Sequence, residues 1–148
     1  MSTIKDRIKA DTIIAMKAQE KERLATIRFI SAAIKKVEID TRKDLDDAAV
    51  IGILSSSVKQ RRDSIEQFKN GGRADLVAKE EAELAILQAY LPAQLSSEEL
   101  EKIVVEAIQK SGAKSAREMG LVMKVLMPMV AGKAEGSAVS EMVKKKLV

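Results

Sequence analysis

Apolar residues recur at intervals of three and four along the first 91 residues, a spacing that places them on one face of an α-helix. The pattern predicts four helices, at about residues 3–19, 23–40, 47–70 and 73–90. We expect the third to end at Gly71 and Gly72, because glycine readily adopts the left-handed conformation that closes a helix. We expect the fourth to end before Pro92, since a proline pushes the preceding residue out of helical geometry.

Three further helical patterns follow the polar segment LPAQLSSEEL, at about residues 97–111, 116–130 and 137–147. Ser96 with Glu99, and Ser115 with Glu118, have the spacing of a capping box. Ser137 is a suitable N-cap for the last helix. No stretch alternates with the period of two that is typical of a strand. The chain is therefore predicted to be all-α, with a four-helix unit at residues 1–91 and a three-helix unit at residues 92–148.

The composition of the 148 residues restricts both the core and the chemistry. Apolar residues make up 46% of the chain but aromatic residues only 2%, so the core must be built mainly from aliphatic side chains. Phe29, Phe68 and Tyr90 fall at or beside apolar helical positions, and we expect them in the core. Cysteine and histidine are absent, which removes thiol and imidazole nucleophile systems and the commonest metal ligand. We expect no catalysis by this chain alone, no metal site and no cofactor.

Segments that would direct the chain into a membrane are not evident. The first residues, MSTIKDRIKAD, are charged and lack the apolar core of a secretory signal peptide. No run approaches the roughly 18 apolar residues of a membrane-spanning helix. We therefore expect a cytoplasmic protein that does not enter a membrane.

The run MGLVMKVLMPMVAGKAEG at residues 119–136, with LPAQLSSEEL before it, resembles YqeY-like proteins and the tail domain of GatB. The resemblance to YqeY covers the whole chain, including KQRRDSIEQF, GGRADL and ELAILQAYLP, whereas the GatB tail matches only the last third. GatB is the tRNA-handling subunit of glutamine-dependent amidotransferases. The resemblance therefore implies a three-helix tail and an association with carbon–nitrogen ligase activity that uses glutamine as the amido donor. It implies no catalytic residue here, because amide transfer does not occur in that tail.

A basic stripe lies opposite the apolar face of the sixth predicted helix. It comprises Lys114, Arg117 and Lys124, with Lys133 on the following turn. The GatB tail is understood to touch the body of tRNA, so the resemblance implies that this stripe binds phosphates. The same residues are also typical of the solvated face of an ordinary amphipathic helix. Family members commonly carry lysine where this chain has Leu121, and the formal net charge of +4 permits a polyanionic partner without requiring one.

Arg61 interrupts the apolar stripe of the third predicted helix, and Glu80 interrupts that of the fourth, with Glu83 beside it. Gly71 and Gly72 lie midway between the two positions. A helical hairpin that turns at the glycines would bring the arginine and the carboxylates together, so we predict a structural ion pair. No nucleophile, glycine-rich phosphate loop or metal cluster accompanies it, which argues against a catalytic role.

These observations predict a non-catalytic accessory or RNA-interaction module whose partner is tRNA or a tRNA-handling protein. The alternative is a helical protein–protein adaptor that uses the N-terminal unit and has no nucleic-acid role. A polyanion complex should weaken steeply with salt, whereas an apolar protein interface should hardly respond, so salt sensitivity distinguishes the two.

Overall fold

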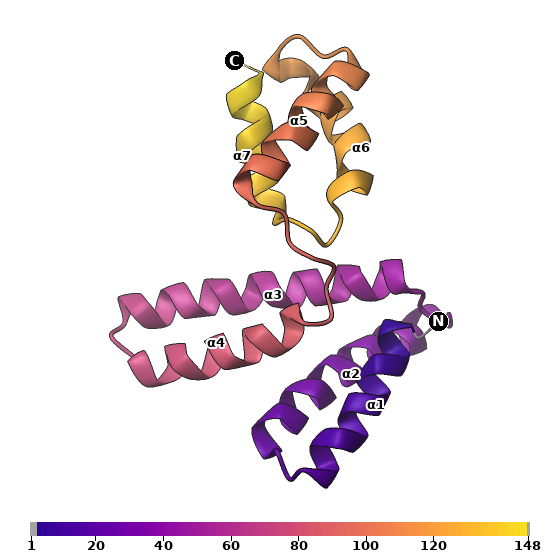
Figure 1. The fold of residues 1–148 in the computed structure, drawn as a ribbon, viewed down its shortest axis with the longest axis vertical. Helices are drawn as coiled ribbons and strands as arrows, with labels where there is room; N and C mark the ends of the chain where they lie inside the picture. The colour runs from indigo at the N-terminus through magenta and orange to yellow at the C-terminus, as the bar shows by residue number, and fades with distance from the viewer. Residues whose placement is uncertain (1–2, 148) are drawn as a thin grey trace. The chain divides into compact units, whose positions relative to one another are not determined.

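The computed structural model describes residues 3–147, which form seven α-helices, one short 3₁₀ helix and no β-strand (Figure 1). The prediction of an all-α fold is confirmed. The elements are α1 (Ile4–Lys17), α2 (Lys21–Thr41), α3 (Asp47–Asn70), α4 (Ala74–Gln88), α5 (Ser97–Ser111), η1 (Ala116–Glu118), α6 (Met119–Val130) and α7 (Gly136–Lys146). The chain divides into two compact units between Leu91 and Pro92.

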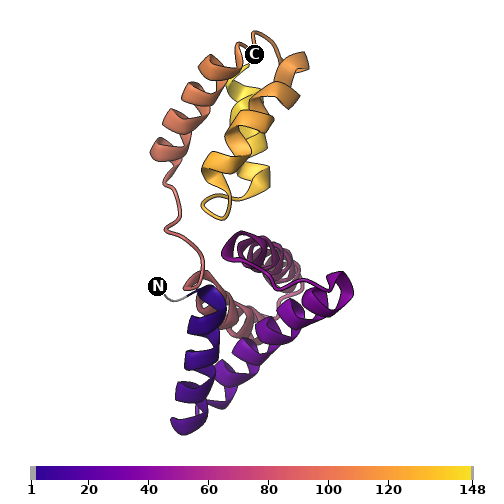
Figure 2. The same cartoon turned by 90° about the vertical axis from the view of Figure 1, so that its right-hand side faces the viewer.

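The first unit consists of two antiparallel helical hairpins, α1 with α2 and α3 with α4, as Figure 1 and Figure 2 both show. The turn between α1 and α2 has the expected three residues but lies two residues earlier, at 18–20, where Gln19 adopts a left-handed conformation with φ 58°. The side chain of Asp46 accepts the backbone N–H of Ala49 at 2.9 Å and so caps the start of α3. Gly72, with φ 71°, closes the α3–α4 turn that the two glycines predicted.

The core of the first unit is aliphatic apart from Tyr90. Its buried residues are Ile4, Ile8, Ala15, Ile27, Ile30, Ile34, Val50, Leu54, Val58, Leu87 and Tyr90. Phe68 is only partly buried, and the expectation that Phe29 lies in this core is wrong, since its side chain is 53% exposed. Phe29 lies on the outer edge of α2, whereas the buried face of that helix is formed by Thr26, Ile27, Ile30 and Ile34.

In the second unit, α5 packs against α6 and α7. Its buried core comprises Leu100, Val104, Ala107, Ala113, Val122, Leu126, Val130, Val139, Val143 and Leu147. Ser96 caps α5 as predicted, because its hydroxyl oxygen accepts the N–H of Glu99 at 3.1 Å. The same hydroxyl donates to the Glu99 carboxylate at 3.0 Å, whereas a full capping box would direct that carboxylate to the Ser96 N–H.

The other two predicted caps are wrong. Ser115 makes no side-chain capping bond, because the chain enters α6 through the 3₁₀ turn η1, and Glu118 instead accepts the N–H of Lys114 at 3.3 Å. Ser137 lies inside α7, which begins one residue earlier at Gly136 with Glu135 at the N-cap.

Across residues 3–147, no helix combines the length and apolar character that would be needed to cross a bilayer.

Candidate nucleic-acid interface

The four basic residues expected to bind phosphate come from consecutive parts of the second unit. Lys114 lies in the turn after α5, Arg117 in η1, Lys124 in α6, and Lys133 in the turn between α6 and α7. All four are exposed, and none forms an ion pair with another residue of the described range 3–147. Their charged ends therefore face solvent.

Helical periodicity places two of these cations on the same side. Arg117 and Lys124 are seven residues apart, close to two turns of helix, and η1 continues directly into α6. Leu121 lies between them in sequence and is 52% exposed. The opposite face of α6 carries the buried residues Val122, Leu126 and Val130. The basic side of the helix is thus free of packing constraints, and a substitution there leaves the core contacts intact.

The two outer cations are attached to backbone that is held by hydrogen bonds. The N–H of Lys133 donates to the carbonyl of Val130 at 2.8 Å, and the carbonyl of Lys133 accepts the N–H of Leu95 at 2.8 Å. The N–H of Lys114 donates to the Glu118 carboxylate. The positions from which these side chains extend are therefore defined, while their ammonium groups remain exposed.

Arg61 lies between the two carboxylates of α4. Its Nη1 is 3.2 Å from Oε2 of Glu80 and also pairs with Oε2 of Glu83. The side chain of Arg61 is 13% exposed and those of both glutamates are 22% exposed. The guanidinium carbon lies 5.3 Å from the centre of the Phe29 ring, a cation–π distance. The structure thus brings together the three residues of the predicted ion pair, across the α3–α4 hairpin.

A second polar cluster, which the sequence did not reveal, joins α1 to the end of α4. The hydroxyl of Tyr90 donates to Oδ2 of Asp11 at 2.6 Å, and Arg7 lies 5.3 Å over the Tyr90 ring. Nη2 of Arg7 also donates to the carbonyl of Ala89 at 3.1 Å. Burial raises the pKa of Tyr90 above its ordinary value of 10.0, and the hydrogen bond to Asp11 raises it further. A buried phenol with a raised pKa acts as a structural donor and not as a base at neutral pH.

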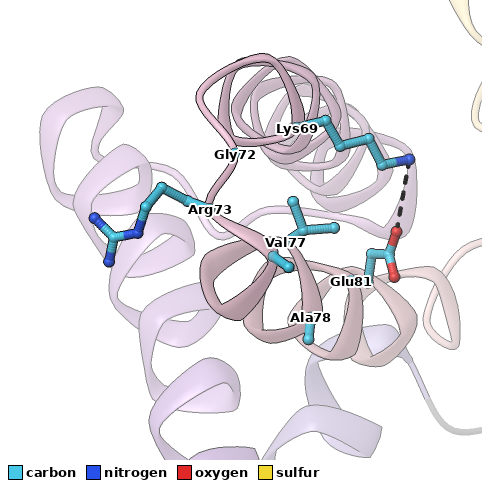
Figure 3. Close-up of a pocket in the computed structure, with 7 residues that line it drawn as sticks. Lys69, Gly72, Arg73, Val77, Ala78 and Glu81 are labelled. Carbon is cyan, nitrogen blue, oxygen red and sulfur yellow. Dashed lines mark ion pairs between the residues drawn. The ribbon is translucent and has the colours of Figure 1, made fainter.

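A shallow groove of about 460 Å³ lies beside the α3–α4 turn and is lined by Lys69, Gly72, Arg73, Ala74, Val77, Ala78 and Glu81. Figure 3 shows the side chains of Lys69 and Glu81 reaching toward each other while Arg73 points away from both. Lys69 and Glu81 pair at 3.9 Å, and Arg73 binds both oxygens of Asp75 at 3.0 and 3.1 Å. The charged groups of the groove are thus paired within the chain, and its lining residues provide no nucleophile–base arrangement.

The comparison with protein families identifies the chain. Residues 5–147 match the family described as Yqey-like protein. The chain belongs to the YqeY-like family. The match confirms the resemblance to YqeY-like proteins that was predicted from the sequence motifs. It covers both units of the chain.

Several curated proteins similar to this chain are named "Altered inheritance of mitochondria protein 41, mitochondrial". The one from Eremothecium gossypii is 46% identical over 96 residues, which are 63% of this chain and 52% of that protein. The one from Pyrenophora tritici-repentis is 35% identical over 147 residues, 95% of this chain and 77% of that protein. The one from Lachancea thermotolerans is 44% identical over 85 residues, 57% of this chain and 46% of that protein. The chain thus spans about half the length of two of these relatives.

The expectation of a cytoplasmic protein is contradicted, because these relatives are named as mitochondrial proteins. That expectation rested on the missing apolar core of a secretory signal, which bears only on the secretory route. Import into mitochondria uses amphipathic, arginine-rich segments. Such segments have no continuous apolar core, so the absence of that core does not argue against import.

Proposed function

We propose that this YqeY-like protein is a non-catalytic RNA-interaction module whose second unit binds the phosphate backbone of tRNA. The observation that carries the proposal is the set of exposed cations Lys114, Arg117, Lys124 and Lys133, which have no ion-pair partner within residues 3–147 and lie on one short stretch of chain. In this proposal the chain supplies binding, and any amide-transfer chemistry belongs to a separate protein that handles the same tRNA.

Folded RNA is the form of nucleic acid that these residues suit. A single-strand binder stacks bases on exposed aromatic rings, and the second unit contains no Phe, Tyr or Trp. Lysine and arginine side chains bind phosphates through charge and position the protein without reading bases. We therefore expect tRNA to be recognised by its shape and charge, with little dependence on base sequence.

The test is the affinity of the full chain for fluorescently labelled tRNA, measured by anisotropy. Reversing the charge of Arg117→Glu and Lys124→Glu together should weaken binding at least about tenfold, because two of the four phosphate contacts become repulsive. The substitution Leu121→Lys should tighten binding, since it adds a cation between the two on the same exposed side of α6. Circular dichroism of each variant should match the parent.

A matched control distinguishes binding at a defined interface from binding that depends only on the net charge of the protein. Lys102→Glu with Lys144→Glu makes the same change in total charge at exposed positions of α5 and α7 in the same unit. This control should retain most of the affinity. If both double variants lost affinity equally, net charge alone would explain binding, and if neither lost it, this surface would not be the RNA site.

A further inference from the structure

The outer face of α2, opposite its core residues, carries a row of exposed residues that are apolar except for Lys36. Ala25, Phe29, Ala32, Lys36 and Ile39 follow one another at intervals of four, three, four and three residues, and all five are exposed. Phe29 is 53% exposed and Ile39 is 66% exposed. The core residues of α2 lie on its opposite face. A helix that packs on one side only has no structural need for this spacing on the other.

The spacing is that of a coiled-coil seam. In a heptad, positions a and d alternate at three and four residues, so Phe29 and Lys36 occupy a while Ala25, Ala32 and Ile39 occupy d. The small side chains of Ala25 and Ala32 leave room for knobs from a facing helix. A groove of about 340 Å³ on this face is lined by Ala32, Lys35, Lys36, Ile39 and Asp40. The seam from Ala25 to Ile39 spans 15 residues, which is about two heptads of the 21-residue helix α2.

One side of the seam is uniformly basic. Lys21, Arg28 and Lys35 are spaced by seven residues and occupy the g position. Arg28 and Lys35 immediately precede the a residues Phe29 and Lys36, and Lys21 lies one heptad earlier, before Glu22. All three are exposed, and none forms an ion pair with another residue of the described range. Charges at the e and g positions select the partner of a coiled-coil helix. The row of cations therefore favours a partner that carries carboxylates along its facing edge.

We infer that this face of α2 binds an acidic amphipathic helix of a partner protein. A second copy of the chain fits poorly. In an antiparallel pair the g positions face each other, so Lys21, Arg28 and Lys35 would oppose cations. In a parallel pair Lys36 would meet the Lys36 of the other copy at the centre of the seam, and like charges there repel. An acidic helix meets neither obstacle and can pair its carboxylates with the three cations and with Lys36.

The surface lies in the first unit and does not involve the cations proposed to bind tRNA. Its failure and the failure of the proposed function can therefore be distinguished by separate variants. A docking role also accounts for the exposure of Phe29. That ring covers the Arg61 guanidinium on one side and extends the seam on the other.

The probe is a labelled 21-residue peptide of three heptads, with leucine at a and d and glutamate at e and g. An otherwise identical peptide with lysine at e and g is the comparison. The full chain should bind the acidic peptide at least about tenfold more tightly than the basic one, as charge complementarity across such an edge sets partner choice. The preference should weaken as salt increases.

The variants place a charge in the seam without touching the core. Ile39→Glu and Ala32→Glu should each weaken binding of the acidic peptide at least about tenfold, a loss expected when charge replaces an apolar contact at the centre of an interface. Arg28→Glu with Lys35→Glu should reverse the preference toward the basic peptide. The matched controls are Ile14→Glu and the pair Lys9→Glu with Lys17→Glu, all at exposed positions of α1. These should bind as the parent does.

Three results would overturn the inference. The first is equal binding of the acidic and basic peptides, or no binding of either. The second is unchanged affinity of the Ile39→Glu variant while its circular dichroism matches the parent. The third is a parent chain that sediments as a dimer when Ile39→Glu is a monomer, because a second copy would then occupy the face.

Discussion

Arg61 and Tyr90 are polar side chains held inside the first unit by partners on another helix. Burial without a partner would destabilise the guanidinium of Arg61 and the hydroxyl of Tyr90. Arg61 pairs with Glu80 and Glu83, and the Tyr90 hydroxyl donates to Asp11. The contacts connect α3 to α4 and the end of α4 to α1. At this scale the role of both residues is to fix how helices pack.

Removing the cation of the Arg61 site should destabilise the protein more than removing either anion. Arg61→Met keeps most of the apolar stem but leaves Glu80 and Glu83 facing each other, and should cost about 2–3 kcal/mol, between the values for dry and exposed pairs. Glu80→Gln or Glu83→Gln should cost only about 1 kcal/mol, because the arginine keeps one carboxylate. Urea unfolding measures the difference, with Lys59→Met on the exposed side of α3 as the control. Equal losses for Arg61→Met and the control would contradict a structural ion pair.

Tyr90 should make stability fall at high pH. Its pKa is raised by burial and by the bond to Asp11, so above about pH 10 the unfolded chain loses the phenolic proton while the folded chain keeps it. The unfolded state then binds fewer protons, and the free energy of unfolding decreases as pH rises. Tyr90→Phe should remove this part of the decrease.

The measurement is direct because Tyr90 is the only tyrosine and the chain has no tryptophan. Phenolate absorbance in the near ultraviolet reports this single group. It should appear together with the loss of helical circular dichroism and not before it. Phenolate formation in the fully folded protein, with the helical signal unchanged, would show that the hydroxyl is not held as described.

At the scale of single elements, the apolar spacing determines where helices form, and local contacts determine how they begin. Ser96 and Ser115 carry the same motif, with a glutamate three residues later, yet only Ser96 caps a helix. The difference is that α5 starts as an α-helix, whereas α6 is preceded by a 3₁₀ turn with a different N–H geometry.

The way in which these helices begin predicts how strongly each serine contributes to the stability of the second unit. Ser96→Ala should lower the stability of the second unit by about 1 kcal/mol, the usual loss for an N-cap whose oxygen accepts a backbone N–H. Ser115→Ala and Ser137→Ala should change it by less than about 0.5 kcal/mol, as expected for residues without such a role. Thermal unfolding followed by circular dichroism compares the three variants. Similar effects for all three would mean that the helix starts described for α5, α6 and α7 are wrong.

Features that depend on local spacing were predictable from the sequence, whereas features that depend on tertiary packing were not. The period of apolar residues and the breakers Gly72 and Pro92 predicted the helices, because they report burial and backbone geometry directly. The contact of Arg61 with Glu80 and Glu83 was predictable, because residues at similar distances from the turn of a helical hairpin face each other.

The hydrogen bond between Tyr90 and Asp11 was not predictable, because the two residues are 79 positions apart and their contact depends on how two hairpins pack. Phe29 was misplaced because both faces of α2 carry apolar residues, and periodicity alone does not say which one is buried.

At the scale of the whole molecule, the chain consists of two units with separate cores, and the division falls at the Leu91–Pro92 junction. The two surfaces proposed for binding lie in different units, tRNA on the second and an acidic helix on the first.

The second unit should fold by itself. A fragment of residues 93–148 contains the complete core of that unit, including Leu100, Leu126 and Val143, so it should keep a helical spectrum and unfold cooperatively. Circular dichroism of the fragment measures this. A largely unstructured fragment would show that the unit depends on the rest of the chain for its stability.

The measurement that tests the central claim most directly is the salt dependence of tRNA binding by the full chain. With three or four phosphates neutralised, log K should fall by about 2–4 units per tenfold increase in salt. The variant with Arg117→Glu and Lys124→Glu should show a slope shallower by about 1.4–1.8, because two contacts are lost. An affinity that hardly changes with salt, or a slope that is the same in parent and variant, would contradict binding of the RNA backbone by these four residues.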